Sequence, residues 1–307
     1  MQNVLYRIVY AFFYLLSLLP FKVLYLLSDV AYVVVYYVVR YRRRVVRRNL
    51  TSAFPDKSEK EIRTIERQFY HWFCDYFNET VKLLSISRSQ LLQHIEFRGV
   101  EQVEACFDKG QNCSGILGHY CNWEWLSTTC LAFRRYPDAV TGLIYHPLRS
   151  QIFDRLFLDM RQSMGGVCIP KRDILRYIVN YKRENRHTLF GYISDQAPKW
   201  ENIHLWLPFL NHDTPVFTGG ERIMRKTNDA VFYLEMQRPR RGHYVCTFKL
   251  LTSAPASLPD NEITTRFFQL LEQTITAAPA YYLWSHDRWR RTREEYNHRF
   301  PNKQANT

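Results

Sequence analysis

The N-terminal segment constrains the fold of this chain more than any other feature of its sequence. Residues 8–39 are overwhelmingly apolar, and six arginines follow between Arg40 and Arg48. The apolar stretch is long enough for one tilted transmembrane helix or for a helical hairpin inserted into one leaflet. In either case the arginines belong on the cytoplasmic side, against anionic headgroups. We therefore predict a membrane anchor with a basic flank at residues 1–48 and one folded domain at residues 49–307.

Two other interpretations of this segment compete with an anchor. A cleaved secretory signal is disfavoured because no A-x-A site precedes the arginines, and because such a cluster resists translocation. A hairpin buried in the core, with a solvated basic end, would also account for the apolar stretch.

Net charge and cysteine content narrow the choice of partners and compartment. The formal net charge of the 307-residue chain is +13, which predicts an anionic partner: nucleic acid, an anionic membrane surface or an acidic carrier protein. The seven cysteines are scattered and form no CxxC pair. This spacing indicates reduced thiols that face the cytosol.

Strand-like and helical patterns alternate from about residue 95 onward. The strand-like runs are Ile95–Phe97, Gly115–Leu117, Ala139–Tyr145, Leu189–Ile193, Ala230–Leu234 and Tyr244–Leu250. Helical patterns occupy 99–108, 123–134, 148–163, 171–183, 217–227 and 260–277. Before them, a linker at 49–55 leads to a capping box at Ser58–Glu61, which opens a helix that runs to about Leu84. The alternation predicts an α/β sandwich with a mostly parallel central sheet.

The segment GILGHYCNWEW at 115–125 carries the clearest candidate for chemistry. His119 and Glu124 are five residues apart, so they diverge on a helix and on a strand and meet only if the chain turns. Gly118 can break the strand, and Asn122 can cap a following helix. We therefore predict that His119, at a strand end, approaches Glu124 in the first turn of a helix. Imidazole titrates near neutral pH and suits a general base.

This segment and the anchor together resemble the lysophospholipid acyltransferase superfamily and, more narrowly, the lauroyl/myristoyl-type bacterial lipid A biosynthesis acyltransferases. GHYCNWE (118–124) is similar to the family's G-H-x-x-x-x-E/D box. Further similar stretches follow in order up to about residue 294: YHP at 145–147, Arg161, GYISDQAPK at 191–199, WLPFL and TPVFTGG within 206–220, and PAYYLWSHDRWRRTRE at 279–294. Two positions depart from the family pattern. His146 replaces a usual arginine, and Asp287 stands where a basic residue is common.

The resemblance implies a fold, a reaction and a location. The fold is a glycerolipid-acyltransferase-like α/β sandwich with an N-terminal membrane-anchoring helical segment. The reaction moves a fatty acyl chain from a thioester to a hydroxyl of a lipid A precursor by direct attack, in lipopolysaccharide biosynthesis. The location is the bacterial inner membrane, with the catalytic domain on the cytoplasmic face.

The resemblance also implies roles for individual residues. His119 would be the general base, and Glu124 its orienting partner. Arg161 would bind an acceptor phosphate or support the site, and Asp195 would belong to the site. Asn122 and Arg288 complete the predicted set as supporting or substrate-binding residues.

The implied acyl donor is an acyl carrier protein or acyl-CoA. An acidic carrier would suit the basic surface that we expect around Arg288, Arg290, Arg291 and Arg293. We expect no metal and no redox cofactor, because the sequence contains no metal-ligand spacing and no glycine-rich nucleotide loop.

Three alternatives remain open at this point. The same chemistry could act on another acceptor: a lysophospholipid, an aminolipid or a glycolipid. A basic membrane-tethered binding protein is the non-enzymatic alternative, but the basic residues are not interleaved with aromatic residues along one face, which disfavours nucleic acid. Cys121 could be a nucleophile, although nothing marks it as an activated thiol and a packed residue is the simpler interpretation.

Overall fold

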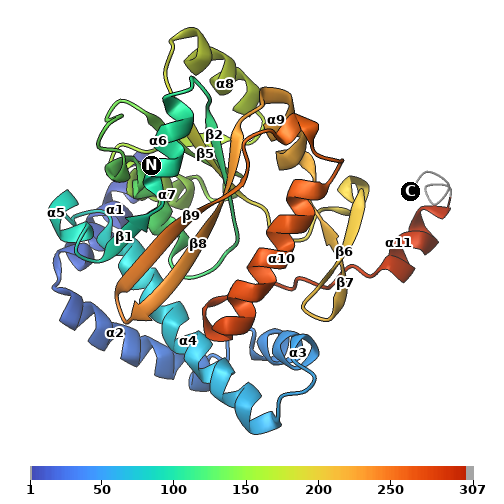
Figure 1. The fold of residues 1–307 in the computed structure, drawn as a ribbon. Coiled ribbons are helices and arrows are strands. Elements are labelled where there is room, and N and C mark those ends of the chain that lie inside the picture. Colours follow the sequence, from blue (N-terminus) through green and yellow to red (C-terminus); the bar gives the residue numbers. More distant parts are fainter. Residues whose placement is uncertain (1, 302–307) are drawn as a thin grey trace.

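The computed structural model describes residues 2–301, so the last six residues of the predicted domain, 302–307, lie outside it. Its centre is a seven-stranded sheet in the order β1-β9-β8-β2-β5-β3-β4 (Figure 1). The strands are β1 (Ile95–Arg98), β2 (Cys113–Leu117), β3 (Val140–Tyr145), β4 (Val167–Pro170), β5 (Thr188–Ile193), β8 (Ala230–Arg240) and β9 (His243–Thr252). All neighbouring pairs are parallel apart from β8 and β9. The predicted α/β class with a mostly parallel sheet is confirmed.

Within residues 2–301 the chain forms eleven α-helices, which include one near each predicted helical position except 123–134. They are α1 (Gln2–Leu18), α2 (Phe21–Val33), α3 (Arg43–Ala53), α4 (Glu59–Lys82), α5 (Arg88–Leu91), α6 (Val100–Phe107), α7 (Gln151–Gln162), α8 (Ile174–Arg183), α9 (Gly219–Thr227), α10 (Glu262–Ala277) and α11 (Arg293–Arg299). The predicted helix at 123–134 is a 3-10 helix, η2 (Trp123–Ala132). The capping box that opens α4 is present, with Ser58 and Glu61 bonding each other's backbone N–H.

Sequence patterns did not predict the second sheet, a hairpin of β6 (Leu205–Phe209) and β7 (His212–Val216). Its two-residue turn, Leu210 and Asn211, has both φ angles positive, at 51° and 61°. Such a turn usually carries Asn-Gly or Asp-Gly, and a leucine in this conformation is uncommon. The hairpin therefore lacks the sequence signal by which hairpins are normally recognised.

The N-terminal segment forms two helices that pack on α4 and separate at Leu19 and Pro20 (Figure 1). A π-helical turn, η1 (Val34–Val38), extends α2. Within residues 2–301, Phe21–Val38 is the one helical segment long and apolar enough to cross a membrane, and 17% of it is buried. Exposed apolar side chains recur every three or four positions: Val4, Leu5, Ile8, Phe12, Leu15 and Leu18 on α1, then Val23, Leu26, Leu27, Val30, Val33, Val34 and Tyr37. Each helix thus has one face on the protein and one apolar face on the outside.

The predicted linker at 49–55 is largely helical, because α3 continues to Ala53 across the predicted boundary at residue 48. Arg43 and Arg47 both pair with buried Glu66 of α4. Arg48 pairs with Asp287, the position where a basic residue is common in the resembled family. These arginines therefore have internal partners and dock α3 on the rest of the chain.

A buried carboxylate links the N-terminal helices to the sheet. Glu79 of α4 is 1% exposed. It accepts hydrogen bonds from the Tyr25 hydroxyl of α2 (3.0 Å), the Tyr244 hydroxyl of β9 (2.6 Å) and the Asn122 amide (3.0 Å). Burial raises the pKa of this carboxyl group, while the hydrogen bonds from Tyr244 and Asn122 oppose the rise. Three separate segments thus converge on one side chain.

Candidate active site

His119 lies just beyond the carboxyl end of β2, next to the end of β5. The two strands run parallel with Leu117 opposite Ile193, so the segments that follow them leave the sheet at the same edge. His119 Nδ1 lies 2.6 Å from Oδ1 of Asp195. The Asp195 carboxylate is buried, whereas the His119 side chain is 17% exposed. The site therefore stands where functional residues of parallel sheets collect.

The neighbours of His119 define the state of its imidazole ring. The hydrogen bond to Asp195 places a proton on Nδ1, because a carboxylate accepts and does not donate. Gln196 Nε2 lies 3.2 Å from His119 Nε2 and can donate to it. Burial alone would raise the pKa of Asp195, but the charge and hydrogen bond of His119 outweigh burial and lower it. In the neutral tautomer that this hydrogen bond favours, Nε2 carries the lone pair, as a general base requires.

Glu124 has a different partner from the one that the sequence suggested. Its oxygens accept from Arg161 Nε (2.6 Å) and Nη2 (2.7 Å), and the Tyr76 hydroxyl lies 3.4 Å away. Among residues 2–301, no hydrogen bond joins His119 and Glu124. Between them, Cys121 adopts a left-handed φ of 51° before η2 begins. The structure therefore replaces the predicted contact with two separate pairs, and Asp195 occupies the place beside His119.

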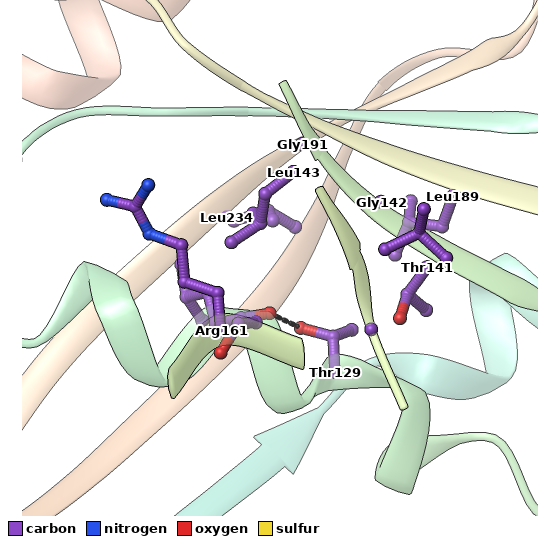
Figure 2. Close-up of a pocket in the computed structure, with 12 residues that line it drawn as sticks. Thr129, Thr141, Gly142, Leu143, Arg161, Leu189, Gly191 and Leu234 are labelled. Atoms are coloured by element: carbon purple, nitrogen blue, oxygen red, sulfur yellow. Dashed lines mark hydrogen bonds between the residues drawn. The ribbon is translucent and has the colours of Figure 1, made fainter. Parts of the chain in front are cut away.

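A cavity of about 10 Å³ lies beside Arg161, between η2, β3 and β5 (Figure 2). Thr141, Leu143, Leu189 and Gly191 are among the residues that line it. This volume is about that of a single water molecule and is far too small for a substrate. Arg161 bonds both oxygens of Glu124 and also lines this small cavity, so the structure gives it a buttressing position.

Asn122 caps η2 as predicted and also anchors it. Its Oδ1 accepts from the Trp125 backbone N–H at 3.3 Å, while its Nδ2 donates to Glu79. Cys121 is fully buried, and burial raises the pKa of its thiol well above the ordinary value. A thiol in this state is a poor nucleophile, which agrees with a packed residue.

Arg288 does not contribute to the predicted basic surface. It is 1% exposed, donates to the Pro215 carbonyl (2.8 Å) and packs over the Phe268 ring. The run of charges from Arg288 to Arg293 suggested solvent, but the side chains of this irregular segment point in different directions. Its neighbour His286 accepts from the Ala197 backbone N–H (3.3 Å), and burial lowers the pKa of His286 to about 4.

Gln196 and His286 are parts of the site that were not among the predicted site residues. Both lie inside segments quoted for the resemblance, GYISDQAPK and PAYYLWSHDRWRRTRE. Gln196 directly follows Asp195 at a strand end, and that placement was the available signal.

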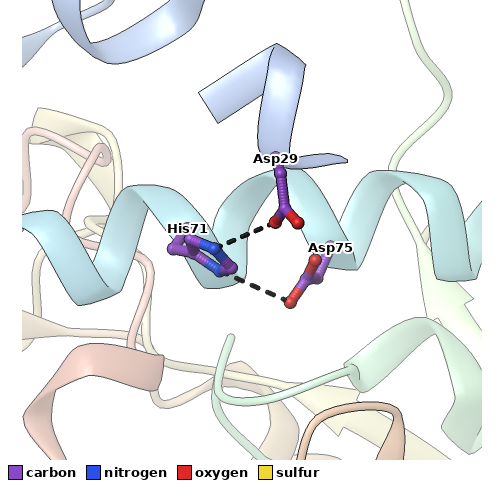
Figure 3. A group of neighbouring side chains, drawn as sticks. All are labelled: Asp29, His71 and Asp75. Atoms are coloured by element: carbon purple, nitrogen blue, oxygen red, sulfur yellow. Dashed lines mark ion pairs between the residues drawn. The ribbon is translucent and has the colours of Figure 1, made fainter. Parts of the chain in front are cut away.

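Asp29, His71 and Asp75 form a second cluster, with ligand atoms within 4.8 Å of one another (Figure 3). Sequence spacing does not reveal it, because Asp29 lies on a different helix. Arg241 donates to both carboxylates at 2.6 Å, and Arg238 donates to Asp75 at 2.7 Å. Since two guanidinium groups neutralise the acids, the cluster is an ion-pair network that joins α2, α4 and the β8–β9 hairpin.

The model of the family described as bacterial lipid A biosynthesis acyltransferase matches residues 2–291. No curated protein matched the chain.

Proposed function

Because this chain belongs to the bacterial lipid A biosynthesis acyltransferase family and is therefore an acyltransferase, we propose that His119 is its general base. In this proposal, a fatty acyl chain moves from a thioester to a hydroxyl of a lipid A precursor. The observation that carries the proposal is the His119–Asp195 pair at the edge of the sheet, in which the His119 side chain is 17% exposed and the Asp195 carboxylate is buried.

The proposed reaction uses no acyl-enzyme intermediate. His119 Nε2 takes the proton of the acceptor hydroxyl while its oxygen attacks the thioester carbonyl carbon. The tetrahedral intermediate collapses with cleavage of the C–S bond, and the imidazolium returns the proton to the departing thiolate. One C–O bond forms, one C–S bond breaks, and the enzyme ends unchanged.

Two groups next to the base support the step. Asp195 holds the Nδ1–H tautomer and stabilises the imidazolium that forms on proton transfer. Gln196 must leave His119 Nε2 when the hydroxyl arrives, and its amide N–H is then free to donate to the developing oxyanion. In this proposal Asp195 stabilises the positive charge on the imidazolium, and Gln196 stabilises the negative charge on the oxyanion.

We assign Glu124 and Arg161 to the support of this site. Their two hydrogen bonds join the start of η2 to α7, and Glu124 is five residues from the base. A fork of two bonds fixes both side chains, so the pair holds the turn that presents His119.

The family is associated with membranes in bacteria, and the two apolar faces of α1 and α2 indicate how this chain could attach. We propose that both helices lie in one leaflet of the inner membrane, with the catalytic domain on the cytoplasmic face. The opposite faces of these helices carry polar contacts to α4, for example Ser28 to Asn78 at 2.7 Å. Apolar area of this extent on a helix pair fits the lipid interface.

The proposed donor is an acyl carrier protein, with acyl-CoA as the alternative, and no metal or redox cofactor takes part. An acidic carrier would be attracted by the net charge of +13. The proton path and the charge stabilisation described above are supplied by His119, Asp195 and Gln196 alone.

Mass spectrometry of lipids from cells with and without this protein tests the function. We expect one acyl chain fewer on lipid A when the protein is missing, and restoration by the wild type but not by His119→Ala. If the change is confined to phospholipids, aminolipids or glycolipids, that lipid is the acceptor instead of a lipid A precursor, and the proposed acyl-transfer chemistry still applies. Transfer assays with acyl carrier protein and acyl-CoA as donors would identify the thioester.

A further inference from the structure

Three basic residues and a histidine lie just beyond the strand ends at the sheet edge that carries His119. His146 follows β3, Lys171 and Arg172 follow β4, and Lys199 lies four residues beyond Asp195. β5, β3 and β4 are parallel neighbours in the sheet, so the segments that follow them emerge together. Tyr145 is opposite Pro170, and the Lys171 backbone N–H donates to the Tyr145 carbonyl at 3.0 Å. We call His146, Lys171, Arg172 and Lys199 the basic rim.

The members of the basic rim lie within electrostatic reach of one another. After burial, the repulsion of Lys171, Lys199 and Arg172 lowers the pKa of His146. All four side chains are exposed. A cluster of like charges that the fold holds together without a counter-ion produces a local positive potential.

No acidic side chain in the described part of the chain neutralises this rim. Lys171, Arg172 and Lys199 form neither an ion pair nor a side-chain hydrogen bond within residues 2–301. Of the acids near these residues in sequence, Asp173 pairs with Arg176 and Asp154 accepts from the Leu148 backbone N–H. Glu201, two residues from Lys199, forms no ion pair with it in the described part of the chain. The positive charge is therefore available to a ligand.

Arg161 cannot supply the same interaction. Two of its nitrogens, Nε and Nη2, are bonded to Glu124. An anion near it would have to compete with a carboxylate that is 2% exposed. The basic rim is therefore a better candidate for the role of phosphate ligand that the resemblance implied for Arg161.

We propose that the basic rim binds a phosphate group of a substrate and thereby places that substrate against His119. The proposal rests on the acyltransferase function described above. Phosphate suits the rim because its oxygens accept several charge-assisted hydrogen bonds from ammonium and guanidinium groups. The phosphate belongs either to the lipid acceptor or to the thioester donor, both of which must reach the same edge of the sheet.

The test uses two double variants with the same loss of charge. Lys171→Gln/Lys199→Gln removes two rim cations, neither of which touches the His119–Asp195 pair. Lys182→Gln/Lys226→Gln is the matched control, because both lysines are exposed, have no ion pair in the described chain and line a groove beside the amino ends of β2, β5 and β8. Melting temperatures establish that both proteins are folded.

The first readout is independent of catalysis. Calorimetric titration of the full chain in detergent with inorganic pyrophosphate should give about tenfold weaker binding for the rim variant, as expected for lost charge-assisted bonds. The control variant should bind like the wild type. Equal binding by all three proteins, or equal weakening in both variants, would overturn the proposal.

The second readout identifies the source of the phosphate. If the acceptor supplies it, the rim variant raises KM for the phosphorylated acceptor about tenfold and leaves KM for its dephosphorylated form unchanged. If the donor supplies it, KM for the acyl thioester rises with either acceptor. Unchanged KM values for both substrates in an active rim variant would refute phosphate binding by the basic rim and would leave the proposed function intact. A wild-type protein without transfer activity would refute the proposed function. The pyrophosphate titration would still show whether the basic rim binds phosphate.

Discussion

His119 and Glu124 are five residues apart on one segment, but their partners bind them in different ways. In the first pair one imidazole nitrogen is held by a buried carboxylate, while the other meets only the displaceable Gln196 amide. In the second pair both carboxylate oxygens are bound by one guanidinium group. The comparison teaches that a pair whose outer contact is a single neutral amide is available for chemistry, whereas a pair whose carboxylate is bound at both oxygens by a guanidinium group fixes structure.

The strongest test of the comparison removes the base itself. General-base assistance contributes roughly 10²–10⁴ to a rate, so His119→Ala should lose at least that factor in kcat. The variant should remain folded but melt at a lower temperature, because the buried Asp195 carboxylate loses its partner. Acyl-transfer kinetics and thermal melts check both statements. Retention of near-normal activity would exclude His119 as the base.

The next largest effect is expected from the carboxylate behind the base. Asp195→Asn keeps an oxygen that can accept from Nδ1–H but removes the charge that offsets the imidazolium, so kcat should fall on the order of 10² or more. Residues that act as a unit are non-additive, so the double variant with His119→Ala should be no slower than His119→Ala alone. Additive losses would show that Asp195 acts outside the pair.

The second pair should respond in stability rather than in chemistry. Glu124→Gln leaves the largely buried Arg161 guanidinium without a charged partner, which should cost about 3 kcal/mol of unfolding free energy. Denaturant titration measures that loss. Arg161→Met/Glu124→Gln should recover part of it, because neither charge is then stranded. If Glu124→Gln keeps its stability and loses its rate, Glu124 acts chemically and our distinction between the pairs fails.

A pH titration of stability tests His286, which bonds the backbone close to Asp195 of the first pair. His286 has a pKa lowered to about 4 in the folded protein, against an ordinary value near 6.5. The unfolded chain therefore binds the extra proton first, and stability should decline as the pH falls from about 6.5 to 4, by on the order of 2 kcal/mol. His286→Gln should flatten this part of the stability curve measured by denaturant titration. An unchanged slope would assign the acid sensitivity to another group.

The smallest effect is expected at the residue between the two pairs. Cys121→Ser removes the alternative nucleophile with little change of size, and the rate should stay within a few-fold of the wild type. Acyl-transfer kinetics of this variant also provide the control for His119→Ala. A dead Cys121→Ser enzyme that remains folded would favour a covalent mechanism.

Much of the fold could be predicted because its signals are local. Apolar runs located six of the seven central strands and missed β4, which follows two glycines and ends at Pro170. The partner of His119 could not be found in the same way, because Asp195 is 76 residues distant and reaches it only through the parallel register of β2 and β5. Arg288 shows a related limit: composition marks a basic segment, but packing decides which of its side chains is buried.

The three hydrogen bonds that converge on Glu79 have a practical consequence for the preparation of this enzyme without lipid. Deleting the N-terminal helices would strip one donor, Tyr25, from a carboxylate that Asn122 and Tyr244 share. The same deletion would remove Asp29 from the arginine network around Asp75. We therefore expect a truncated protein to be marginally stable rather than a convenient soluble fragment. Shielding the outer apolar faces with detergent or nanodiscs, and keeping the helices, is the sounder route to a sample.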